Sequence, residues 1–257
     1  MSTMSTMSPI TISMLVFAFV FSGGLLGTFI RSLLPSEHLD SDSKDAVRLG
    51  MALVGTTLAL VLGLLIASDK GFYDSQNTEV TQAAANVVLL DRMLAHYGPE
   101  AEGVRAVLRS TVSHWVDLTW QHDDSAKTRF EPTAVGSEAL LDKIQGLSPQ
   151  NDMQRSLQSQ ALNSLIQLAQ IRWLLYAQKA SSVPTPLLAM LIFWLTLLFT
   201  SFGLFVRPNV TVVVSLFASA LAVCGAIFLI LEMYQPYSGF IRVSEAPLRA
   251  ALAQLGR

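Results

Sequence analysis

Residues 49–67 read LGMALVGTTLALVLGLLIA, and no charged side chain lies between Arg48 and Asp69. A helix rises about 1.5 Å per residue, so about 20 apolar residues cross the roughly 30 Å hydrocarbon core of a bilayer. A stretch of this length and composition predicts a transmembrane helix. The rest of the fold depends on where the chain repeats this pattern.

Three further runs meet the same requirement, at residues 10–30, 187–206 and 209–231. They end where charge or proline begins, at Arg31, at Arg207-Pro208 and at Glu232. The first run could instead be a secretory signal peptide. It has no basic segment before it, exceeds the usual apolar core of about 7–15 residues and offers no Ala-x-Ala cleavage site. We therefore expect four transmembrane helices, preceded by a short polar N-terminus at residues 1–9.

The composition agrees with a membrane protein. Of the 257 residues, 51% are hydrophobic and 14% are charged, which is too apolar for an ordinary soluble domain. The lipid bilayer is the expected partner, and the net charge of −2 provides no basic surface for nucleic acid. The single cysteine, Cys224, excludes an intramolecular disulfide, and its apolar surroundings favour a buried side chain.

Residues 69–183 separate the second and third runs and hold 23 of the 36 charged groups, which indicates a water-facing domain. Helical periodicity predicts helices at 74–97, from Pro99 to Trp120, at 137–144, and from an N-cap at Ser148-Pro149 to Lys179. The first of these is compatible with direct continuation of the second span, with Gly71 as the weak point. No segment shows a β pattern, so the predicted fold is all-α.

The helix that ends at Lys179 has a neutral polar face, made of Ser156, Gln160, Asn163, Gln167 and Gln170 at spacings of three and four. A solvated surface is the commoner reason for such a face. An aqueous vestibule or a subunit contact remains open as an alternative, because uncharged amides suit both.

Small residues recur at helical spacing within the spans. Such patterns let helix backbones approach closely in lipid, either inside one bundle or between subunits of an oligomer. The patterns are Gly23 with Gly27; Gly55, Ala59 and Gly63; and Ala218, Ala222 and Ala226.

Motifs of common enzyme classes are absent: the chain has no P-loop, no dinucleotide-binding GxGxxG, no HExxH and no GxSxG. His114 and Asp117, together with His122-Asp123-Asp124, form the one polar cluster that could carry protons or metal, and we interpret it as a solvated surface. We expect no enzymatic activity, no cofactor and no metal.

Glu232 ends the fourth run in the stretch FLILEMYQPYSG at residues 228–239. At the last turn of a span a carboxylate can reach the interface and be hydrated. It also faces the unfavourable end of the helix dipole, so we expect a compensating partner, with Arg242 or Arg249 as candidates. Residues 232–257 are predicted to form a folded tail.

Three segments resemble a known family: VRLGMALVGTTLALVLGLLIASDKGFYDSQ at 47–76, LLDRMLAHYGPEA at 89–101, and GAIFLILEMYQPYSGFIRVSEAPLRAAL at 225–252. They are similar to the bacterial membrane proteins of domain-of-unknown-function family 4239, also called bestrophin-like-domain proteins. The resemblance implies four spans with a helical domain between the second and third. It also implies kinship to bestrophins, which are pentameric anion channels.

The chain departs from these relatives at two places. Tyr234 and Gln235 stand where the family usually has an aspartate, and Tyr237 stands in place of phenylalanine. Bestrophins line their neck with aromatic residues on the second helix, whereas residues 49–67 contain none.

Positive charge near the spans predicts the orientation. Six basic residues lie on the side of the membrane that holds the middle domain and both termini, and four lie on the other side. The excess favours a cytoplasmic middle domain with cytoplasmic termini. The membrane is then expected to be a bacterial inner membrane. The first set is Lys70, Arg172, Lys179, Arg242, Arg249 and Arg257, and the second is Arg31, Lys44, Arg48 and Arg207.

Two functions fit the sequence. The first is a homo-oligomeric ion channel or permease of the bestrophin-like kind, with anions as the expected ions. The second is a non-conducting membrane scaffold or sensor whose helical domain binds a partner protein.

Overall fold

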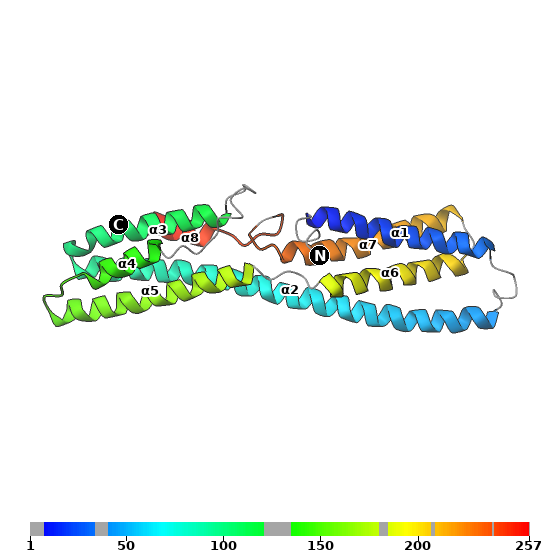
Figure 1. Cartoon of the computed structure of the whole chain (residues 1–257), viewed down its shortest axis with the longest axis horizontal. Helices are drawn as coiled ribbons and strands as arrows, with labels where there is room; N and C mark the ends of the chain where they lie inside the picture. The colour runs from blue at the N-terminus through cyan, green and yellow to red at the C-terminus, as the bar shows by residue number, and fades with distance from the viewer. Residues whose placement is uncertain are drawn as a thin grey trace. The chain divides into compact units, whose positions relative to one another are not determined.

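The computed structural model describes residues 8–33, 41–120, 135–179, 185–206, 209–237 and 239–256 (Figure 1). Within these ranges every regular element is a helix, and four helices are long and apolar enough to cross a membrane. The prediction of an all-α membrane protein is therefore confirmed. The chain divides into a membrane unit, Met1–Gly71 with Ser182–Tyr234, and a middle unit, Phe72–Ser181 with Gln235–Arg257.

The membrane unit contains α1 (Pro9–Leu33), the first part of α2 (Ser41–Tyr97), α6 (Thr185–Phe205) and α7 (Val210–Met233). α7 begins at the N-cap Asn209, whose side chain accepts a hydrogen bond of 2.8 Å from the backbone N–H of Val212. The core of this unit is built from aliphatic side chains that are fully buried, among them Val16, Val20, Leu195, Ala220 and Ile227.

α1 and α6 approach closely because both carry small residues where they meet. A Cβ atom added to Gly23 would lie 2.8 Å from Thr196 Cγ2, and one added to Gly27 would overlap the carbonyl oxygen of Thr200. On the opposite helix, a Cβ atom on Gly203 would overlap the carbonyl oxygen of Gly24. The Gly23–Gly27 pair thus lies at a helix contact within one chain.

The middle unit contains the second part of α2, the 3-10 turn η3 (Pro99–Ala101), α3 (Glu102–Trp120), α4 (Val135–Gln145), α5 (Asp152–Lys179) and α8 (Ala246–Gln254). α2 runs through Gly71 without a break and ends before Gly98, whose φ of 129° suits only glycine. Each α-helix of the unit contributes one face to the hydrophobic core, in which Leu90, Leu108, Leu140, Leu165 and Leu248 are buried.

One local prediction in this unit is wrong. α5 begins at Asp152, and its N-cap is Asn151, whose Oδ1 accepts a 2.8 Å hydrogen bond from the N–H of Gln154. The Ser148-Pro149 pair lies before this cap, outside the helix, because the Asn151 side chain accepts from a free N–H group of the first turn. The helix predicted at 137–144 is present as α4, which begins two residues earlier, at Val135.

The C-terminal segment is folded into the middle unit. The indole Nε1–H of Trp120 donates a 2.8 Å hydrogen bond to the carbonyl of Val243, and its ring meets that of Tyr237 edge to face with centroids 5.5 Å apart. Val243, Leu248 and Leu255 are buried in the core of the unit. The chain after α7 therefore supplies part of the hydrophobic core of the domain that precedes α6.

Candidate functional site

The membrane-spanning part of α2 is the least covered of the four spans. Only 6% of its most apolar stretch is buried, compared with 28–33% in α1, α6 and α7. Four leucines and a threonine form an exposed stripe on it, which we call the α2 outer face: Leu49, Leu53, Thr56, Leu60 and Leu64. The other three helices of this unit leave this face open for lipid or for another copy of the chain.

Hydroxyl groups in the spans bond to the backbone of their own helices. Thr56 and Thr57 both donate to the carbonyl of Leu53 at 2.9 Å, and Thr196 and Thr200 donate to carbonyls four residues back at 2.8 and 2.7 Å. These hydroxyl groups are therefore already satisfied without facing one another across the bundle.

Of the small residues on α2, Gly55 touches α6, because a Cβ atom added to it would lie 3.2 Å from Leu198 Cδ1. Ala59 is exposed, and a Cβ atom on Gly63 would meet nothing within 4 Å. Ala218 and Ala222 of α7 are exposed as well. Unlike Gly23 and Gly27, most of these small residues do not serve packing within one chain.

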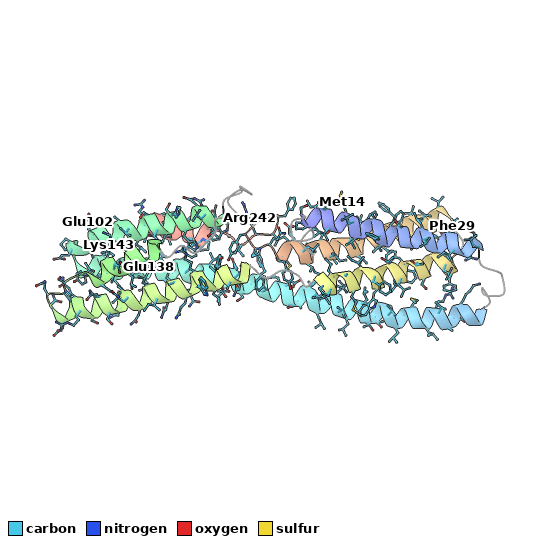
Figure 2. All side chains as sticks on the ribbon, in the orientation of Figure 1. Met14, Phe29, Glu102, Glu138, Lys143 and Arg242 are labelled. Carbon is cyan, nitrogen blue, oxygen red and sulfur yellow. The ribbon has the colours of Figure 1, made fainter. Side chains whose placement is uncertain are left out.

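Glu232 lies in a different environment from the one that we expected. Its side chain is 2% exposed at the last turn of α7, so the prediction of a hydrated carboxylate at the interface is wrong. Tertiary packing covers it, which the one-dimensional pattern does not reveal. Arg249 forms an ion pair with Glu245 at 2.9 Å, while Arg242 is exposed on the segment before α8 (Figure 2). A pairing of Glu232 with Arg242 stays a prediction.

Asp69 is a second buried carboxylate of the membrane unit, two residues beyond the predicted end of the span at Ala67. Its side chain accepts a hydrogen bond from the hydroxyl of Tyr234, and its Oδ2 atom has no hydrogen-bond partner among the described residues. Burial raises the pKa of Asp69 from 3.8 to about 6, and the bond from Tyr234 opposes part of this rise. Sequence reasoning missed this residue because it treated Asp69 as a marker of the span boundary.

The neutral face of α5 is exposed along its length, including Gln160, Asn163, Gln167 and Gln170. Gln160 donates a 3.1 Å hydrogen bond to Ser156 on the same face. The structure adds exposed apolar side chains between the amides, which sequence reasoning missed because it considered only the polar residues of this face. We call the combined surface the α5 outer face: Asn163, Ile166, Gln167, Gln170, Trp173 and Leu174.

The α5 outer face carries no charge, and Trp173 on it is 60% exposed. An exposed helix face usually carries charged residues, whereas the centres of protein interfaces are poor in charge and rich in aromatic residues. The composition of the α5 outer face therefore resembles that of a protein–protein interface.

Metal binding receives no support from the described ranges, where no three His, Cys, Asp or Glu side chains come together. His114 and Asp117 are exposed on α3, and His122-Asp123-Asp124 lie outside the described residues. Cys224 is buried in α7, as predicted.

Comparison with known proteins identifies a family from the sequence and similar folds among solved structures. The family model of the bestrophin-like domain matches residues 17–248. A tryptophan-to-alanine variant of a bacterial bestrophin homologue from Klebsiella pneumoniae is 13% identical, with 97% of each chain covered and a TM-score of 0.71. An isoleucine-to-threonine variant of such a homologue from the same organism is 14% identical, with 94% of each chain covered and a TM-score of 0.66. None of the curated proteins matches the chain.

Proposed function

The chain belongs to the family of proteins with a bestrophin-like domain, and from this membership we propose that it forms a homo-oligomeric ion channel that conducts anions. The observation that carries the proposal is the open α2 outer face, since one of four spans is left almost uncovered by its own chain. The narrower assignment to domain-of-unknown-function family 4239 rests on the three sequence segments quoted above.

In the proposed oligomer, the α2 outer faces of several copies surround the ion path. The leucine side chains of this face line it, with Thr56 as the polar residue on the face. A helix that lines a water-filled path does not need cover from its own subunit, which explains why α2 differs from α1, α6 and α7. Anions are proposed on family grounds.

The α5 outer face supports the same assembly in the middle unit. Its amides both donate and accept hydrogen bonds, so they can pair with a neutral face on a neighbouring copy. Trp173 and Leu174 supply apolar area for that contact.

The orientation and location are part of the proposal: a bacterial inner membrane, with the middle unit and both termini in the cytoplasm. A cysteine placed at the exposed Glu138 of α4 in a Cys224→Ser background tests the orientation. An impermeant thiol reagent should leave it unmodified in intact cells and modify it after lysis. Modification in intact cells would reverse the assignment.

Conduction is tested with purified protein in liposomes loaded with chloride. We expect chloride efflux that stops when Thr56→Cys in the Cys224→Ser background is treated with a water-soluble thiol reagent. The control is Met14→Cys, because Met14 projects from α1 and is exposed on the outside of the bundle (Figure 2). Efflux from the control should survive the reagent. A monomer that carries neither chloride nor other small ions would refute the channel.

A second function is favoured by the exposed Trp173: a non-conducting scaffold or sensor whose middle domain binds a partner protein through the α5 outer face. In that case a protein should co-purify with the chain and be lost in Trp173→Ala, while the number of subunits stays the same. In the channel, Trp173→Ala should weaken the oligomer instead. The proposal includes no enzymatic step and no cofactor.

A further inference from the structure

A groove of about 590 Å³ runs along the surface of the membrane unit between α2 and α6, with a contribution from α7. Its volume falls within the range of roughly 300–1,000 Å³ that is typical of small-molecule sites. On the α2 side the lining includes small side chains that project little into the groove. On the α6 side it includes aromatic rings that project further. The small residues are Ala52, Gly55 and Ala59, and the rings are Phe199, Phe202 and Phe205.

The groove is apolar along its length and basic at one end. Among the described residues, Arg48, Ser201 and Ser219 bring polar side chains to its lining. Arg48 directly precedes the first residue of the span, so it lies at the depth of lipid headgroups. The guanidinium makes a 3.5 Å ion pair with Asp45, and both side chains are exposed. Exposed ion pairs are weak, so the guanidinium of Arg48 can also bind another anionic group.

We propose that this groove binds an acyl chain of an anionic phospholipid whose phosphate group contacts Arg48. The lining positions on α2 extend from Arg48 to Leu62, which is roughly 21 Å of helix. This length accommodates a chain that reaches from the headgroup level through one leaflet of a core about 30 Å thick. The site differs from the α2 outer face, because none of that face's residues lines the groove.

The charge at the end of the groove favours lipid over a helix of a second copy. A helix laid along the groove would place apolar side chains over Arg48 and leave a charged group with too few acceptors, which is unfavourable. A phosphate group offers several oxygen acceptors to the planar guanidinium. The adjoining apolar walls then receive the acyl chain.

Native mass spectrometry of the full chain tests the proposal without reference to ion flux. The protein is equilibrated in micelles with equal amounts of phosphatidylglycerol and phosphatidylcholine that carry the same acyl chains. We expect one retained lipid per chain and a preference for phosphatidylglycerol of roughly fivefold, the effect of one basic residue near an anionic headgroup.

Three variants separate the parts of the site. Arg48→Gln should abolish the preference and keep the lipid, whereas Ala59→Trp should fill the groove and lose the lipid. Leu60→Trp is the matched control, because Leu60 is a neighbouring exposed residue on the α2 outer face and should retain the lipid. If Ala59→Trp loses its helical circular dichroism, Ala52→Trp, which narrows the same groove, takes its place.

The proposal is overturned if the wild type retains no lipid, if Arg48→Gln keeps the preference, or if the groove-filling variant retains as much lipid as Leu60→Trp. It is also overturned if that variant keeps its lipid but dissociates the oligomer, because a second copy would then occupy the groove.

Discussion

Arg105 on α3 holds the carboxylate of Asp91 on α2 through two parallel hydrogen bonds, from Nε to Oδ1 at 2.8 Å and from Nη2 to Oδ2 at 2.9 Å. The side chain of Asp91 is 2% exposed, and the backbone N–H of Gly256 also points at its Oδ2, at 3.5 Å. One buried carboxylate therefore connects α2, α3 and the C-terminal end of the chain within the middle unit.

Removal of Arg105 should destabilise this unit strongly. In Arg105→Met the Asp91 carboxylate stays buried without its cation, and breaking a buried pair in this way costs about 3–5 kcal/mol. Arg155→Met is the control, since the Arg155–Asp152 pair is exposed and worth about 0–1 kcal/mol. Thermal unfolding in detergent should show a large fall in Tm for the first variant and almost none for the second. Equal Tm values would mean that the Asp91–Arg105 pair is energetically neutral.

The C-terminal helix should be as important for stability as the helices of the middle domain. Leu248 on α8 is fully buried, so Leu248→Ala should cost about 2–5 kcal/mol through lost burial and a cavity. Limited proteolysis should then cut the middle unit faster than in the wild type. Gln254→Ala changes an exposed residue of the same helix and should not alter the rate. Unchanged proteolysis of Leu248→Ala would show that the tail does not support this core.

The glycines of the spans should differ in their tolerance of a methyl group. Gly27→Ala places a Cβ atom on the carbonyl oxygen of Thr200, so α1 and α6 must separate and Tm should fall. Gly63→Ala adds a methyl group in open space, and a better helix former at that position should leave Tm the same or slightly higher. If both variants lose the same stability, the surroundings of Gly63 are filled in the assembled protein. That result would point to a subunit contact along α2.

The four spans could be predicted from the sequence because length and lack of charge suffice to specify them. The uninterrupted α2 was harder to predict, since Gly71 weakens a helix without breaking it. Burial of Glu232 and Asp69 could not be predicted, because it depends on which helices cover each residue in three dimensions. The exposure of Trp173 and Ile166 depends on the same packing, so it becomes visible only in the structure.

Asp69 should make the stability of the membrane unit depend on pH. Its pKa is raised by burial from 3.8 to about 6, so the folded state binds this proton more tightly than the unfolded state. The stability that the protonated carboxyl group provides is fully present below about pH 4 and is lost as the pH rises through 6. Asp69→Asn keeps an acceptor for the hydroxyl of Tyr234 but never acquires charge. We therefore expect its Tm to exceed that of the wild type at pH 8 and to match it near pH 4, whereas Asp142→Asn, at an exposed position on α4, should follow the wild type throughout. A Tm difference that does not change between pH 4 and pH 8 would show that ionisation of Asp69 is not responsible.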